Sequence, residues 1–300
     1  MIHAIRKIIS HALYCSGITY LLYKIGSKKT LILVYHRVLK LRQNFGLDPG
    51  VVSASPYNFN EQMEYLSKRY KVISLEKFLE FHKEKKQPPK NTVVITMDDG
   101  YKDNYLSAYQ ILKKYNFSAT IFLTTYGMDK NRLFWWDKVA YIINKTKIKY
   151  FYLKELGKYS LENKNKRLRA LKKILLRLKS ASELEKNFLI KKLSGMLKVK
   201  LPRKNKKIFL SWDEVREMSK HNISFGDHTA THPILSKVPI KKAEEEIKKS
   251  KARIEKEINK KISFFCYPNG EFPDFNSQIK KILKENGFES SFIRLPGRNS

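Results

Sequence analysis

Short apolar segments alternate with segments of helical pattern along most of this 300-residue chain, and this alternation limits the possible folds more than any other feature. Strands are predicted at 31–35, 71–74, 92–97, 118–123, 223–226, 262–266 and 288–294, with the first and third of buried type. Helices are predicted at 58–69, 75–85, 104–115, 211–221, 240–260 and 276–286. Asn58 with Glu61, and Ser211 with Glu214, fit capping boxes that begin two of these helices. Such alternation builds βαβ units, so we expect an α/β fold with a parallel sheet or barrel.

The alternation is interrupted between about 131 and 207. Leucines recur there at helical spacing, at 168, 171, 175 and 178, and Ser180 with Glu183 fits a further capping box. Leu184, Phe188 and Met196 form a second apolar stripe. We therefore expect a helical insertion. It is strongly basic, because 144–207 holds 22 Lys and Arg against four Glu, a net charge of +18.

Residues 1–29 precede the first strand, and we expect an amphipathic helical segment there, followed by one barrel-like domain over 30–300. The longest uncharged run, 8–23, is sixteen residues long, whereas a spanning helix needs about 20 apolar residues. Arg6 and Lys7 before an apolar stretch weakly resemble a signal peptide, but no clear cleavage site follows. Two interpretations of this segment stay open: a helix that lies on a membrane face, and a helix that caps the fold. The sequence thus favours a cytoplasmic or peripherally membrane-associated protein over an exported one.

The formal net charge of +33 favours an anionic partner. The sequence disfavours nucleic acid, because no zinc-finger, RNP or Gly-rich RNA motif is present. Lys also outnumbers Arg 48 to 13, whereas base readers favour Arg. Peripheral contact with an anionic membrane or an acidic polymer stays open, as does a purely compositional origin of the lysines. Two cysteines, Cys15 and Cys266, exclude a disulfide-dense scaffold and a Cys₄ zinc site.

Polar clusters follow four of the predicted strands directly. They are His36, the pair Asp98 and Asp99, the pair His228 and His232, and the turn at 267–270. The carboxyl ends of parallel strands form one rim, where α/β folds place their sites. Taken singly, an Asp-Asp-Gly is often an ordinary turn and a lone His a core residue. Together these residue types at one rim favour metal-assisted hydrolysis.

The chemistry of such a site can be assembled from these groups. A catalytic metal typically has three protein ligands and one open position, and His228, His232 and one aspartate supply that number. The other aspartate is then free to act as general base on water activated by the metal. A turn N–H from 268–270 can stabilise an oxyanion, and a His can protonate the leaving amine.

Four motifs carry a resemblance to a known family. TMDDG at 96–100 resembles the T-F-D-D-G motif of the polysaccharide deacetylase family (NodB homology, carbohydrate esterase family four). HTATH at 228–232 matches its H-[ST]-x-x-H motif, and FCYPNG at 265–270 resembles its F-x-Y-P-x-G motif. LVYHRV at 33–38 resembles the Y-H-x-V run of a branch that includes deacetylases of exported poly-N-acetylglucosamine.

The resemblance implies a distorted (β/α)₇ barrel that carries the basic helical insertion. It implies Asp98 as general base, His36 as general acid and the backbone N–H of Asn269 in the oxyanion hole. The implied metal ligands are Asp99, His228 and His232, and the metal would be Zn²⁺ or another divalent ion. The implied reaction removes N-acetyl groups from amino sugars of a polysaccharide or glycan. A deacylase for another amide or an O-acetyl ester, and a non-catalytic glycan-binding relative, are the alternatives.

The sequence departs from the family pattern at several motif positions. Cys266 or its neighbours stand where many members carry an Arg, Asn269 stands where Tyr is frequent, and Met97 replaces Phe. Asp227 replaces the commoner Ser before the first motif His. Its carboxylate is expected either to support an imidazole or to lie in a solvated turn.

Overall fold

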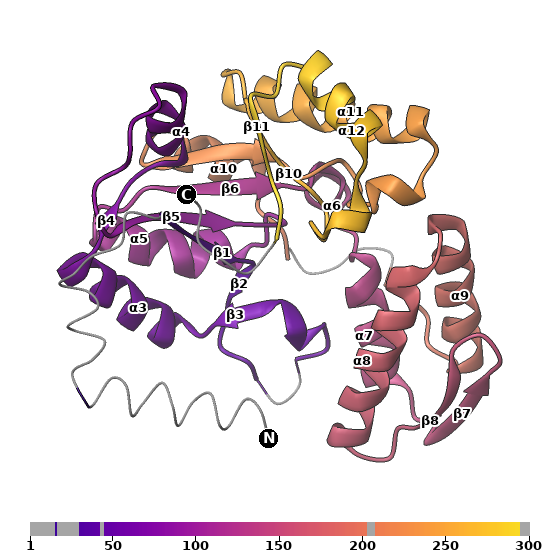
Figure 1. The fold of residues 1–300 in the computed structure, drawn as a ribbon. Coiled ribbons are helices and arrows are strands. Elements are labelled where there is room, and N and C mark those ends of the chain that lie inside the picture. Colours follow the sequence, from indigo (N-terminus) through magenta and orange to yellow (C-terminus); the bar gives the residue numbers. More distant parts are fainter. Residues whose placement is uncertain (1–15, 17–29, 43–44, 203–207, 295–300) are drawn as a thin grey trace.

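A seven-stranded, curled parallel sheet forms the centre of the molecule in this computed structural model, which describes Ser16 and residues 30–42, 45–202 and 208–294 (Figure 1). The strands run in the order β1-β5-β6-β9-β10-β11, and the short β4 pairs with the start of β5. Their bounds are β1 Leu31–Tyr35, β4 Lys71–Val72, β5 Thr92–Met97, β6 Ala119–Leu123, β9 Ile223–Asp227, β10 Phe264–Cys266 and β11 Ser290–Phe292. All of these pairs are parallel, so the predicted α/β fold with a parallel sheet is confirmed.

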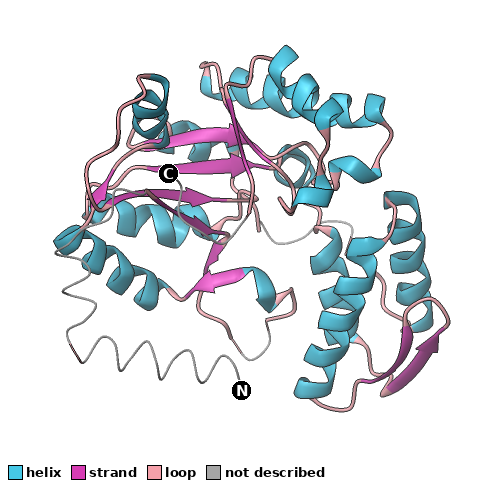
Figure 2. Ribbon diagram, in the orientation of Figure 1, coloured by secondary structure: helices cyan, strands magenta, loops and turns pink. Residues whose placement is uncertain are grey.

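Helices cover the sheet, and the two faces of the strands enter different hydrophobic clusters (Figure 2). The helices are α3 Pro56–Arg69, α4 Leu75–Lys83, α5 Gln110–Lys114, α6 Thr125–Lys130, α10 Trp212–Met218, α11 Ile240–Ile258 and α12 Ser277–Glu285. Val93 and Ile95 of β5 pack in the larger cluster, whereas Val94 packs with Leu75 and Leu79 of α4. This alternation is the period of two expected of a strand buried on both faces.

The differences from the expected elements have local causes. β1 was expected to be buried, but Val34 is 42% exposed, because among the described residues β1 pairs with β5 alone. α3 begins at Pro56, not at a capping box on Asn58, because Ser55 caps it by accepting a hydrogen bond from the Asn58 N–H. The predicted 104–115 helix has a π-helical first part, Asn104–Tyr109, before α5. The capping box at Ser211 and Glu214 is confirmed.

A second hydrophobic core lies in the chain between β6 and β9, in what we call the basic segment (131–202). It comprises α7 Trp135–Lys145, the antiparallel hairpin β7 Tyr150–Leu153 and β8 Gly157–Ser160, α8 Lys164–Ser180 and α9 Glu183–Met196. Helices were expected here, but the hairpin was not. These elements lie beside the sheet and at one end of it (Figure 1).

Two details of the basic segment were predicted wrongly. Ser182, not Ser180, caps α9, through the Glu185 N–H. Leu184 and Phe188 are 86% and 60% exposed, so the expected apolar stripe is not the buried face of α9. That face carries Lys186, Leu189, Ile190 and Leu193 instead.

The expected N-terminal amphipathic helix over 1–29 lies outside the described residues, apart from Ser16. In the part of the chain that the structure describes, none of the helices is both long and apolar enough to cross a bilayer.

Gly226 in β9 is required by close packing, and Gly226→Ala is expected to destabilise the protein by about 1–3 kcal/mol. A Cβ at this position would lie 2.6 Å from two ring carbons of Phe122 and 2.9 Å from the carbonyl oxygen of Phe264. Gly195→Ala in α9 is the matched control, because its added Cβ meets nothing within 4 Å. It should instead gain about 0.4–1 kcal/mol. Urea unfolding measures both variants, and equal midpoints would contradict this account.

Candidate active site

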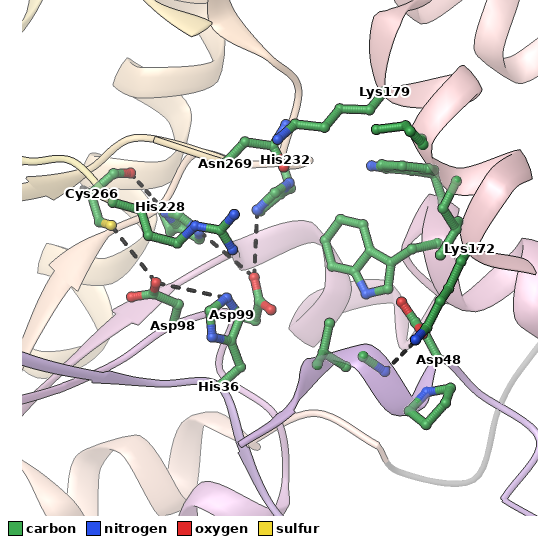
Figure 3. Close-up of a pocket in the computed structure, with 18 of the residues that line it drawn as sticks. His36, Asp48, Asp98, Asp99, Lys172, Lys179, His228, His232, Cys266 and Asn269 are labelled. Atoms are coloured by element: carbon green, nitrogen blue, oxygen red, sulfur yellow. Dashed lines mark hydrogen bonds and ion pairs between the residues drawn. The ribbon is translucent and has the colours of Figure 1, made fainter. Parts of the chain in front are cut away.

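Three buried side chains from two strand ends converge on one point. Asp99 follows β5, while His228 and His232 lie on the loop that follows β9. Asp99 Oδ1 lies 3.7 Å from His228 Nε2 and 3.6 Å from His232 Nε2 (Figure 3). The structure therefore brings together the three residues that were predicted as metal ligands.

The donor chemistry of this cluster fits a divalent metal ion. Both carboxylate oxygens of Asp99 are buried without a hydrogen-bond partner among the described residues. Burial, followed by the neighbouring Asp98, raises the pKa of Asp99 well above its ordinary value, a cost that a bound cation would offset.

The two imidazoles are held in the state that a metal requires. Burial lowers the pKa of His228 to about 3 and that of His232 well below its ordinary value, so both rings are neutral at pH 7. His228 Nδ1 lies 2.7 Å from the carbonyl oxygen of Cys266. Donation of an N–H to that carbonyl leaves the Nε2 lone pair of His228 directed at Asp99.

Asp98 and His36 lie together beside the metal-ligand cluster. His36 Nε2 is 4.0 Å from Asp98 Oδ2, and the Cys266 thiol donates to the same oxygen at 3.9 Å. Burial raises the pKa of Asp98 to about 7, while burial and then the Arg294 charge lower the pKa of His36 to about 4. A carboxyl group that titrates near neutral pH suits a general base.

Four residues of the site that are not glycine have left-handed backbone conformations. Their φ angles are 77° at Asp99, 67° at Thr229, 62° at His232 and 63° at Asn269. Such a conformation is costly, most of all for a β-branched residue such as Thr229. Asn269 lies in the wall of the same cavity as Asp98 and His36, where it was expected. Clustered strain of this kind is typical of functional sites.

Hydrogen bonds to buried carboxylates hold the loop that carries the two histidines. Asp227 Oδ1 accepts from the Thr229 N–H at 2.8 Å, and Glu246 of α11 accepts from both the N–H and the hydroxyl of Thr231. Asp227 is fully buried, so a solvated turn is the wrong interpretation. The hydrogen bond that its Oδ1 accepts comes from this backbone N–H, so the carboxylate holds the loop and does not bond directly to an imidazole of the described residues.

A buried ion pair that the sequence analysis missed positions His36. Arg37 Nη2 lies 2.7 Å from Asp103 Oδ2, and the Val38 N–H donates to Asp103 Oδ1 at 2.9 Å. The Asn104 side chain donates to the His36 carbonyl oxygen at 2.8 Å. These contacts fix the short strand β2 (Arg37–Val38), which pairs with β3 (Val52–Ala54). The sequence feature that could have indicated these contacts is the polar pair Asp103 and Asn104, which follows closely after Asp98 and Asp99.

The site opens into a cavity of about 580 Å³, and the basic segment forms one of its walls. Trp136 packs edge-on against the His232 ring, with centroids 4.7 Å apart. Its indole N–H donates to the hydroxyl of Tyr101, which in turn donates to Asp137. Lys172 and Lys179 of α8 also line the cavity (Figure 3). The sequence left open whether the basic segment lies beside the active-site rim or on the flank of the barrel.

Comparisons with known proteins identify relatives of this chain. The family model described as "Polysaccharide deacetylase" matches residues 85–291. Poly-beta-1,6-N-acetyl-D-glucosamine N-deacetylase of Staphylococcus aureus is 32% identical over 186 residues, which cover 55% of this chain and 62% of that protein. YxkH of Bacillus subtilis, named for the polysaccharide deacetylases, is 22% identical over 215 residues, 72% of this chain and 49% of that protein. This chain thus matches only about half to three fifths of these relatives' length.

Solved structures share the fold. The deacetylase PplD of Streptococcus pyogenes, solved in complex with acetate, gives a TM-score of 0.60 at 20% identity, covering 90% of this chain and 85% of that one. A deacetylase domain from Bordetella bronchiseptica gives 0.56 at 15% identity, covering 92% of each chain. The family match begins at residue 85, so it does not cover the Y-H-x-V run at 33–38. Because the match spans the aspartate pair, both histidines and the 265–270 turn, the chain belongs to the polysaccharide deacetylase family.

Proposed function

We propose that this protein is a metal-dependent hydrolase that removes N-acetyl groups from amino sugars of a glycan and releases acetate. The observation that carries the proposal is the buried convergence of Asp99, His228 and His232 beside Asp98 and His36 in one open cavity. The 32% identity to a relative named for an N-acetylglucosamine polymer supports the substrate class.

Asp99, His228 and His232 would hold Zn²⁺ or another divalent ion. When bound, such an ion supplies Lewis acidity that polarises an amide carbonyl and makes water more acidic. The three side chains are buried in the cavity lining, whereas His36 and Asn269 of the same lining are partly exposed, so a substrate amide would meet these two residues as it reaches the metal ligands.

Asp98 would take a proton from the attacking water, a task that suits its pKa near 7. His36 would deliver a proton to the departing amine. Since burial holds His36 neutral at pH 7, it first has to receive that proton. Asp98 lies 4.0 Å away, close enough to pass the proton on through water or a substrate atom. The backbone N–H of Asn269 would donate to the carbonyl oxygen as that oxygen gains negative charge.

The chain is organised as one domain with an insertion. Since β6 pairs directly with β9 in the sheet, the residues between them, about 131–207, act as an insertion in the 30–300 barrel-like domain. Its elements lie where the carboxyl ends of β5 and β9 deliver the candidate catalytic groups.

Metal analysis combined with a product assay on N-acetylglucosamine oligomers tests this function. We expect about one divalent ion per chain and equal amounts of acetate and free amine. Acetate released only from O-acetylated sugars, with a hydroxyl as the other product, would show an esterase instead. Protein without metal that binds the oligomers but releases no acetate would show a glycan-binding relative.

A further inference from the structure

Helix α8 has two functional faces. Ala170, Leu171, Ile174 and Leu178 are buried in the core of the basic segment. A different set of positions on α8 lines the catalytic cavity, namely Leu168, Lys172, Leu175, Leu176 and Lys179. The spacing of this second set, i, i+4, i+7, i+8 and i+11, is that of one helix face. The wall of the cavity opposite the strand ends is therefore built of leucine and lysine.

The charge of α8 has one sign, since the helix contains eight Lys or Arg and no acidic residue. A groove of about 440 Å³ lies between this helix and β8, and no acidic residue lines it. Its basic residues are Lys158, Lys166, Arg169, Lys172 and Lys173. Lys166 pairs with Glu162 at 2.5 Å. The other four cations have no ion pair among the described residues, so the groove has a surplus of positive charge.

Lys172 joins the groove to the catalytic cavity, because it lines both. From the cavity, a ligand that passes Lys172 reaches the groove lined by Arg169, Lys173 and Lys158. The carboxylate of Asp48, which also lines the cavity, interacts electrostatically with Lys172. At the cavity itself, Lys179 and Arg294 share the single carboxylate of Glu271, at 2.9 and 3.5 Å. A row of side chains of one charge that leads into a cleft attracts and orients a polymer of the opposite charge.

We propose that the glycan on which this protein acts is anionic, with negative groups repeated along the sugar chain, and that the groove between α8 and β8 binds the part that extends out of the catalytic cavity. This inference rests on the proposed function and adds a substrate class to it. The cations of the groove recognise carboxylate, sulfate or phosphate groups as point charges, and the leucines of α8 contact the sugar carbons.

An anionic membrane is the competing occupant, and the geometry disfavours it. A helix that binds a membrane presents an apolar face to the lipid, but the apolar residues of α8 face the protein core or the catalytic cavity. The exposed apolar side chains nearby are Leu176 of α8 and Leu184 and Phe188 of α9. Leu176 lines the catalytic cavity, and none of the three lines the groove. A concave groove suits a chain-like ligand better than a flat lipid surface.

The test measures binding of a labelled oligosaccharide of alternating glucuronate and N-acetylglucosamine to the metal-loaded full chain, against a neutral N-acetylglucosamine oligomer of equal length. The groove variant is Lys158→Gln/Arg169→Gln/Lys173→Gln, which spares Lys172 in the cavity wall. Lys241→Gln/Lys256→Gln/Lys284→Gln removes the same charge from exposed lysines of α11 and α12, and is the matched control. Thermal melts verify that both variants fold.

We expect the unmodified chain to prefer the anionic oligomer, with a preference that weakens at high salt. The groove variant should lose about tenfold in affinity for it, and the control should lose less than about twofold. Equal binding of both oligomers, or equal losses in both variants, would overturn the proposal. So would a groove variant that no longer sediments with phosphatidylglycerol vesicles but still binds the oligosaccharide, because the groove would then be a membrane site.

Failure of this inference is distinguishable from failure of the proposed function. Acetate release from neutral oligomers without any preference for the anionic probe removes the inference and leaves the function. Groove-dependent binding of the anionic probe without acetate release from any substrate removes the function, and with it the assignment of this glycan as a substrate.

Discussion

Asp98→Asn is expected to lower the rate of acetate release by about 10²–10⁴-fold while the protein keeps its full metal content. The carboxamide has nearly the shape of the carboxylate but cannot take a proton from water. Asp98 lies beside the ligand cluster, with Cys266 and His36 as its neighbours, so its loss leaves the three ligands in place. Turnover of N-acetylglucosamine oligomers and elemental analysis of the same sample measure both quantities.

Asp213→Asn controls for the substitution itself, because Asp213 is an exposed residue of α10 whose side chain is 88% accessible. It should change neither turnover nor metal content. If Asp98→Asn instead lost metal in proportion to activity, the two adjacent aspartates would have to exchange their proposed roles.

Asp99→Asn is expected to lower metal affinity by more than about 100-fold, so that the variant neither binds metal nor turns over substrate at metal concentrations that just saturate the unmodified chain. An amide oxygen is a neutral and weaker ligand than a carboxylate, and the neighbouring imidazoles contribute no negative charge. Metal titration followed by tryptophan fluorescence measures the affinity, and acetate release measures turnover.

The thermal stability of the same variant adds an independent readout. Burial raises the folded-state pKa of Asp99, so ionisation of this group costs stability at pH values above its unfolded pKa. Asn removes that cost and also tolerates the left-handed backbone at this position. Metal-free Asp99→Asn should therefore melt at or above the temperature of the metal-free unmodified chain at pH 7. Saturating metal should raise the melting temperature of the unmodified chain only. A metal-dependent rise in the variant would exclude Asp99 as a ligand.

The sequence predicted those parts of the fold that depend on local pattern. The bounds of β5 were predicted to the residue, because a short and mostly apolar run is typical of a strand that is buried on both faces. The same reasoning placed Asp98 and Asp99 at its end and His228 and His232 at the end of β9, and the structure brings these groups together. Strand ends are informative because parallel packing forces them to one rim.

Features that depend on distant partners were not predictable in this way. α9 carries apolar residues on more than one face, and the face that is buried includes Lys186. This lysine is tolerated there because Glu183 neutralises its charge and its Nζ lies 4.7 Å from the centre of the Trp135 ring. The Arg37–Asp103 pair likewise joins residues 66 positions apart. Neither contact produces a periodic pattern in the sequence from which it could be predicted.

The separate core of the basic segment gives this protein a modular construction. Its buried residues belong to a cluster distinct from the one beneath the sheet, and an aromatic cluster that includes Tyr101, Phe134 and Trp136 lies between the segment and the sheet. Substitutions at Leu168 or Leu175 would reshape the cavity wall without disturbing the strands that hold the aspartates and histidines. Under the proposed function, catalysis and substrate choice can therefore evolve at different rates, because the residues proposed for the two tasks lie in parts of the chain with separate cores.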